Sequence, residues 1–165
     1  MNLGIDLGGS HIGVGLVEGS ELKYTVDKFF SEDDRRDIEN AIVRNIDELV
    51  NKILVENNLT LDNIEKIGVA SPGTVSGGKI TSGNLNIKEY NLKSRLEKLY
   101  NKNIKIRNDG KCAALAEKRY GSMKDYDDCV FVNIGTGLGG AAFIDGKLLE
   151  PKRYSGFEFG HMTLV

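Results

Sequence analysis

Apolar and polar residues alternate along the first part of the chain, a pattern typical of β-strands. Apolar segments at residues 3–7 and 12–18 flank a glycine-rich turn, and residues 22–30 alternate well enough to form a third strand. Gly19 and Ser20 indicate a reverse turn between the second and third segments. The pattern therefore predicts an antiparallel meander of three strands.

The spacing of apolar residues then changes to three and four, which indicates an amphipathic helix. The side chains at these spacings are Ile38, Ile42, Ile46, Leu49 and Ile53. Ser31 and the acidic residues that follow it supply an N-cap and a first turn whose charge suits the helix dipole. We therefore expect one long helix that begins after Ser31 and ends near Asn57.

Strands and helices alternate over the remainder of the chain. In order, the predicted elements are a buried strand over residues 66–71, a short helix marked by Leu92, Leu96 and Leu99, a strand over residues 104–107, an alanine-rich helix over residues 110–120, and two strands around a glycine-rich turn within residues 130–144. Asp145 and Gly146 favour a type I′ turn at the end of that hairpin.

This order of elements predicts an α/β fold with a mixed sheet. The strand, turn and strand near the end resemble the beginning of a second copy of the N-terminal meander. We therefore expect an N-terminal α/β lobe over residues 1–108 and the beginning of a second, similar lobe over residues 109–165. The chain ends before that second lobe could be finished, so we expect further strands and helices after Val165.

The composition of the chain argues against several classes of function. Of 165 residues, 28% are charged and the net charge is −2, with acidic and basic residues mixed, which favours neither a nucleic-acid nor a membrane partner. No apolar run is long enough for a membrane span, and no signal peptide precedes the first strand. Cys112 and Cys129 lack the spacing of a metal site or a disulfide framework. We expect a cytoplasmic protein.

Two turns combine glycine with small hydroxyl residues, and such turns expose backbone N–H groups that can bind phosphate oxygens. Their residues are Gly8, Gly9 and Ser10 in the first turn and Gly135, Thr136, Gly137, Gly139 and Gly140 in the second. The second contains the spacing GxGxxG, but the residues that follow predict a strand, whereas dinucleotide-binding glycines open a helix. Two such turns favour a phosphate chain held from two sides over tight hairpins without a ligand.

Asp6 ends the first strand, directly before the first glycine turn. A carboxylate beside a phosphate-binding turn needs a cation between it and the phosphates, so Asp6 indicates Mg²⁺, bound directly or through water. The alternative is an aspartate that only caps the turn.

Asn108 and Asp109 lie where the strand over residues 104–107 meets the alanine-rich helix. Ligands gather at the carboxyl ends of strands in α/β sheets, and phosphoryl transfer to an alcohol needs a carboxylate that accepts the hydroxyl proton. Asp109 suits that general base, while Asn108 could bind a neighbouring hydroxyl. From position alone, a helix N-cap is an equally good interpretation.

Glu158 and His161 lie three residues apart among aromatic residues and glycines. Such a pair could bind a polyol, ligate a metal, or form a buried hydrogen-bonded cluster. One histidine does not make a metal site, and no cysteine pair follows it in the chain.

Taken together, these segments resemble the ROK family of bacterial sugar kinases and sugar-responsive repressors, which belongs to the actin-like, ribonuclease H-like superfamily. The matching segments are Asp6–Ser10, Val69–Val75 followed by Asn84 and Leu85, Asn108–Glu117, Gly135–Gly140 and the ExGH of Glu158–His161. Their order and spacing make the resemblance specific across the whole chain.

The resemblance implies an ATP- and Mg²⁺-dependent kinase in which Asp109 deprotonates a sugar hydroxyl, normally the 6-OH of a hexose or N-acetylhexosamine. Asn108, Glu158 and His161 would bind the sugar, and Gly73 and Asn84 would line its pocket. His161 would also ligate a structural Zn²⁺ where cysteines further along a longer chain complete the site. The resemblance also implies a homodimer. The alternatives are a sugar sensor without catalysis, as in the repressors, and an inactive fragment of a kinase.

Overall fold

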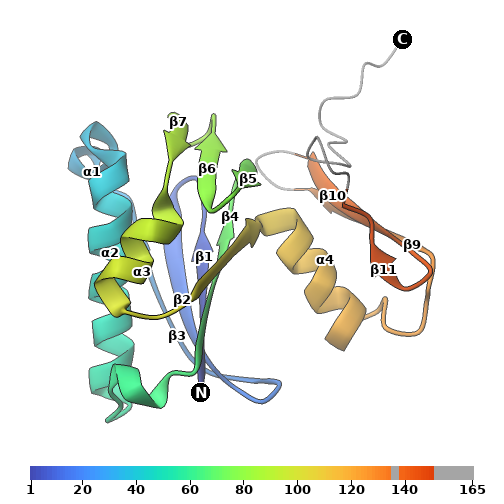
Figure 1. The fold of residues 1–165 in the computed structure, drawn as a ribbon, viewed down its shortest axis with the longest axis horizontal. Coiled ribbons are helices and arrows are strands. Elements are labelled where there is room, and N and C mark those ends of the chain that lie inside the picture. Colours follow the sequence, from blue (N-terminus) through green and yellow to red (C-terminus); the bar gives the residue numbers. More distant parts are fainter. Residues whose placement is uncertain (135–137, 151–165) are drawn as a thin grey trace. The chain divides into compact units, whose positions relative to one another are not determined.

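The computed structural model describes residues 1–134 and 138–150 of the chain. The chain divides into two units, Met1–Asn108 and a second unit that begins at Asp109. The sheet of the first unit has the strand order β3-β2-β1-β4-β8 (Figure 1). Its strands are β1 (Asn2–Leu7), β2 (His11–Glu18), β3 (Glu21–Phe29), β4 (Lys66–Ser71) and β8 (Ile104–Asn108).

The sheet is mixed, as expected from the order of elements. β1, β2 and β3 form the predicted antiparallel meander, whereas β1, β4 and β8 run parallel. Parallel neighbours require crossover connections, which the helical segments between β3, β4 and β8 provide. Parallel strands also end at the same edge of a sheet, so the carboxyl ends of β1, β4 and β8 lie together.

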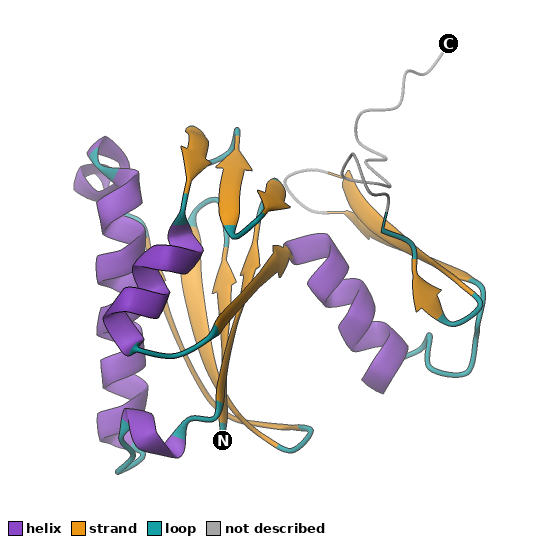
Figure 2. Cartoon of the chain, in the orientation of Figure 1, coloured by secondary structure: helices purple, strands orange, loops and turns teal. Residues whose placement is uncertain are grey.

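One face of this sheet carries the hydrophobic core of the first unit. Helices α2 (Ile38–Glu56) and α3 (Leu92–Tyr100) lie on that face (Figure 2). Alternate residues of the strands point into it and are almost fully buried, among them Leu3, Ile5 and Leu7 on β1. They pack against the apolar stripe of α2 that the sequence predicts. Period-two strands and a period-3.6 helix thus share one core.

On the opposite face of the sheet, the central strands carry several glycines. Gly4 pairs with Gly15 on β2 and with Gly68 on β4, while Asp6 pairs with Gly13 on β2. These residues leave a hollow of about 350 Å³ along β1, β2 and β3. Within the first unit no helix covers this face, and Asp6 is exposed there.

The prediction of a single helix after Ser31 is wrong, because two helices form there. α1 (Glu32–Arg36) ends at Asp37, whose backbone (φ −139°, ψ 61°) is not helical, and α2 begins at Ile38. The Asp37 N–H donates to the carbonyl of Asp34 and closes the short helix. The interruption lets α1 follow the end of β3 while α2 packs its apolar stripe on the sheet.

A small sheet between β4 and α3 was not expected from the sequence. It contains β5 (Thr74–Ser76), β6 (Lys79–Ser82) and β7 (Ile87–Tyr90), all antiparallel. Gly77 and Gly78 turn the chain between β5 and β6 with positive φ angles. A short 3₁₀ helix, η1 (Leu61–Asn63), precedes β4.

The described part of the second unit has a helix and three antiparallel strands. α4 (Asp109–Tyr120) packs on β10 through a small core that includes Ala114 and Phe143. The strands are β9 (Cys129–Ile134), β10 (Leu138–Ile144) and β11 (Lys147–Leu148), in the order β11-β10-β9. This order repeats that of β3, β2 and β1, and positive φ angles at Asp145 and Gly146 confirm the predicted hairpin turn.

Within the described ranges, no helix has both the length and the apolar character that crossing a membrane would require.

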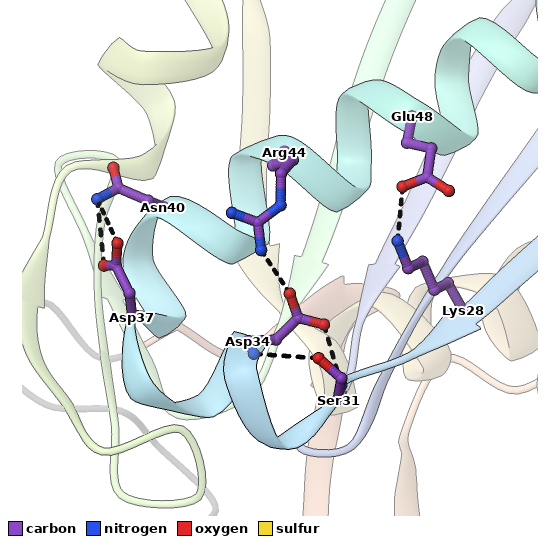
Figure 3. A network of polar contacts seen from close by, with 7 residues as sticks. All are labelled: Lys28, Ser31, Asp34, Asp37, Asn40, Arg44 and Glu48. Atoms are coloured by element: carbon purple, nitrogen blue, oxygen red, sulfur yellow. Dashed lines mark hydrogen bonds and ion pairs between the residues drawn. The ribbon is translucent and has the colours of Figure 1, made fainter.

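A carboxylate at the start of α1 joins the two helices. Asp34 is buried, accepts a hydrogen bond from the Ser31 N–H (2.9 Å) and pairs with Arg44 (2.6 Å), as Figure 3 shows. The Ser31 N–H is the main cause that lowers the pKa of Asp34 from 3.8 to about 2; its hydroxyl and Arg44 act in the same direction, and burial opposes them. The folded state therefore favours the ionised carboxylate.

We expect Asp34→Asn to lower the free energy of unfolding at pH 7 by about 1–2 kcal/mol. Because the folded pKa lies below the unfolded one, this contribution is present above about pH 4 and is lost as the pH falls towards 2. The exposed neighbour Asp33, changed to Asn, is the matched control and should cost less than about 0.5 kcal/mol. Urea unfolding of the two variants and the unmodified chain at pH 7 and pH 3 measures these differences. An equal loss of unfolding free energy in the two variants at pH 7 would contradict a stabilising role of the buried Asp34 carboxylate.

Gly73 holds the sharp turn between β4 and β5. Its φ is +80°, and a Cβ atom built on it would lie 2.1 Å from the carbonyl oxygen of Thr81. Any side chain at this position therefore meets both backbone strain and a steric overlap with β6. Glycine is the residue that satisfies both conditions.

Gly73→Ala should destabilise the chain by more than about 2 kcal/mol, because strain and overlap add. Gly19 also has a positive φ (+60°), but a Cβ there would meet nothing within 4 Å. Gly19→Ala is thus a control for strain alone and should cost about 1 kcal/mol. Thermal unfolding of the two variants compares them. Equal losses of stability in the two variants would mean that the segment around Thr81 moves away from the new methyl group without an energetic cost.

Candidate functional site

The first glycine turn is closed by its own backbone. The N–H of Gly8 donates to the carbonyl of His11 (2.9 Å), and the N–H of Phe30 donates to the carbonyl of Ser10 (2.9 Å). The amide of Gly8 is therefore engaged within the turn. Within residues 1–134 and 138–150, the amides of Gly9 and Ser10 have no partner, so these two groups are the ones that could meet a phosphate oxygen.

Asn84 lies against this turn although it is distant in sequence. A Cβ atom built on Gly9 would be 3.4 Å from the Cβ of Asn84, which is ordinary van der Waals contact. Both residues are at least partly accessible, and Asn84 is exposed. The structure thus brings together one residue expected to bind phosphate and one expected to line the sugar pocket.

A second pair of expected site residues is joined by a hydrogen bond. The side-chain amide of Asn108 donates to the carbonyl of Gly73 (2.9 Å). In the parallel ladder, Asn108 stands beside Ser71, two residues before Gly73. Asn108 thereby fixes the backbone that leaves β4, and the amide is oriented by that contact. All four residues, Gly9, Asn84, Gly73 and Asn108, belong to the first unit.

Asp6 ends the same row of parallel strands, beside Ala70 of β4. Its carboxylate makes no hydrogen bond within the described ranges, so the turn-capping interpretation has no contact to support it. No group of three or more His, Cys, Asp or Glu residues in those ranges could hold a metal ion by itself. A single carboxylate nevertheless suits Mg²⁺, which commonly uses one or two carboxylates together with substrate phosphates and water.

Asp109 begins α4, directly after the end of β8. Its Oδ1 accepts a hydrogen bond from the N–H of Gly110 (2.8 Å), and the residue is exposed. A helix N-cap accepts from an amide two or three positions further along, so this contact differs from that of a cap. The carboxylate is held near the end of β8, where ligands gather in α/β sheets.

Several expected site residues lie outside the described ranges: Gly135, Thr136, Gly137, Glu158 and His161. The remaining residues of the second glycine motif, Gly139 and Gly140, lie on β10 and pair with Asn133 and Val132. The strand that they form agrees with the expectation that no helix begins at this GxGxxG spacing. The role of the second motif in binding phosphate stays a prediction.

Sequence reasoning missed one residue at the first glycine turn. The guanidinium of Arg35 donates to the carbonyl of Gly9 (3.4 Å). Arg35 belongs to a run of alternating acidic and basic residues, which by itself indicates only a solvated helix surface. No signal in the sequence distinguishes it from its neighbour Arg36.

The chain is similar to several known proteins. N-acetylmannosamine kinase from Vibrio cholerae is 31% identical over 99% of this chain and 54% of its own length. Beta-glucoside kinase from Listeria monocytogenes is 44% identical over 44% of this chain and 25% of its own. Xylose repressor from Bacillus subtilis is 35% identical over 47% and 20%.

A solved structure agrees with these relatives. The ROK family glucokinase from Streptomyces griseus, in complex with glucose and AMPPNP, is 25% identical with a TM-score of 0.81 over 99% of this chain and 51% of that one. The likeness confirms the expected actin-like fold. The chain spans about half the length of the relatives that it matches from end to end. The match to the ROK family runs over residues 2–165, and the chain belongs to that family.

Proposed function

We propose that this chain forms part of an ATP-dependent kinase that phosphorylates a sugar hydroxyl, with a hexose or an N-acetylhexosamine as substrate and the 6-OH as acceptor. The observation that carries the proposal is the proximity of Gly9 and Asn84, since a Cβ atom built on Gly9 would lie 3.4 Å from that of Asn84. This proximity supports a site in which the phosphate donor bound at the turn meets a sugar bound beside Asn84. The kinases among the relatives support the same conclusion, and the glucokinase bound to glucose and AMPPNP supports ATP as the donor.

Asp109 is the general base in this proposal. Phosphoryl transfer to an alcohol needs little covalent chemistry from the protein, but the attacking hydroxyl has to be oriented and its proton accepted. The contact of Oδ1 with the N–H of Gly110 restricts the rotation of the carboxylate. Asn108, oriented through Gly73, would bind a neighbouring hydroxyl of the sugar and hold the acceptor in line.

The phosphates of ATP would bind at Gly9 and Ser10, with Asp6 facing Mg²⁺ directly or through water. Mg²⁺ would neutralise charge on the phosphates during transfer. In the same proposal, the second glycine motif grips the phosphate chain from the other side, and Glu158 and His161 bind the sugar. Structural Zn²⁺ at His161 would require cysteines from a longer chain.

The two-lobe organisation is part of the proposal as well. Residues 1–108 would form the N-terminal lobe, and residues 109–165 the beginning of the second. Closure of two such lobes would exclude water, which otherwise competes with the sugar for the phosphoryl group. We further propose a cytoplasmic homodimer that binds neither nucleic acid nor membrane.

A sugar sensor without catalysis is the second candidate. The similarity to xylose repressor favours it, since that relative matches nearly half of this chain. A sensor needs the sugar-binding residues but not the base. Binding of sugar without turnover therefore separates the sensor from the kinase.

Sugar-dependent release of ADP from Mg·ATP tests the proposal, with a panel of glucose, mannose, fructose, allose, N-acetylglucosamine and N-acetylmannosamine. We expect release with one of these sugars, and a loss of roughly 10²–10⁴-fold in Asp109→Asn, because a general base contributes about that much. Sugar binding should survive the substitution. The exposed Asp62, changed to Asn, is the matched control and should keep full turnover.

An Asp109→Asn variant that retained most of its turnover would refute the assignment of the base. Binding of a sugar by the unmodified chain without any release of ADP would favour the sensor. The absence of both binding and release would indicate that residues 1–165 are an inactive fragment.

A further inference from the structure

Arg35 brings a positive charge to the first glycine turn. Its Nη2 donates to the carbonyl of Gly9 at 3.4 Å, and the side chain is exposed to solvent. The guanidinium therefore lies next to the two residues, Gly9 and Ser10, whose amides face no partner within the described ranges. A cation and exposed amide groups beside one another form an anion-binding surface.

The backbone at Arg35 is held beside the turn by the segment that carries it. The N–H of Phe30 bonds to Ser10 of the turn, and Ser31 caps α1 immediately afterwards. Asp34, the residue before Arg35, is buried and pairs with Arg44 of α2. α1 is thus attached to the turn at one end and to α2 along its side, so the backbone of Arg35 stays within reach of the turn.

Arg35 differs from the neighbouring arginines in its ion pairing. Arg36 pairs with Asp33 at 2.8 Å, and Arg44 pairs with Asp34 at 2.6 Å. Within residues 1–134 and 138–150, Arg35 has no carboxylate partner. Its hydrogen bond to the carbonyl oxygen of Gly9 uses one of the five donors that a guanidinium carries.

We propose that Arg35 binds a phosphate group of the nucleotide at the first glycine turn. This inference rests on the proposed function and adds a residue to its phosphate site. Asp6 precedes the same turn and repels phosphate oxygens, so a fixed cation at the turn offsets a negative charge that the site itself contains. A guanidinium can also donate two parallel hydrogen bonds to a phosphate, which lysine cannot.

Binding of Mg·ATP and of inorganic tripolyphosphate to this chain, measured by isothermal titration calorimetry without sugar, tests the assignment. Arg35→Ala should weaken both by about tenfold, which corresponds to about 1.4 kcal/mol. Arg35→Lys should restore part of the affinity through its charge. Arg36→Ala, on the same helix but paired with Asp33, is the matched control and should change affinity by less than twofold.

The midpoint of thermal unfolding distinguishes a binding role from a structural one. Arg35→Ala and Arg36→Ala should leave it equally unchanged, because both side chains are exposed. Tripolyphosphate should lose as much affinity as ATP, since the contact is with phosphate and not with the base or ribose.

Equal affinities in Arg35→Ala and the unmodified chain would overturn the role of Arg35 and leave the proposed kinase intact. A drop in the unfolding midpoint confined to Arg35→Ala would overturn it in favour of a structural role. No binding of either ligand by the unmodified chain would overturn both the nucleotide site and the role of Arg35.

Discussion

The parallel ladder of β1, β4 and β8 is the constraint on which the arrangement of the site depends. Its register sets Asp6 beside Ala70 and Ser71 beside Asn108, so polar side chains from three distant segments end at one edge. Side chains alternate between the two faces of a strand, and a slip of one residue would therefore turn Asn108 away from Gly73. The apolar residues at the other end of the same face, such as Ile104 and Ile67, prevent that slip because they would lose their burial.

Much of the fold follows from periodicity in the sequence. The N-terminal meander, the apolar stripe of α2, and the strands β4 and β8 are all visible as period-two or period-3.6 patterns. The break at Asp37 is not visible, because neither glycine nor proline stands there to signal the end of a helix. The small sheet around Gly77 and Gly78 was also missed, since its strands are short and its residues polar.

The site is less visible in the sequence than the fold. Glycine turns and the pair Asn108 and Asp109 can be recognised from local composition and from the family resemblance. The proximity of Gly9 and Asn84 cannot be recognised in this way, because it depends on the path of the chain through β5, β6 and β7. Arg35 is harder still to recognise, since it differs from Arg36 only in its contacts: Arg35 donates to the carbonyl of Gly9, whereas Arg36 pairs with Asp33.

The small-residue face of the first sheet has a thermodynamic consequence. Gly4 and Gly68 lie side by side in strand interiors, and a methyl group on either would meet nothing within 4 Å in the described chain. Glycine at such a position costs roughly 0.5–1 kcal/mol relative to alanine, because it loses more backbone entropy on folding. The free energy of unfolding of residues 1–108 is therefore lower than it would be with alanine at these two positions. The backbone has room for both methyl groups, which the present sequence does not use.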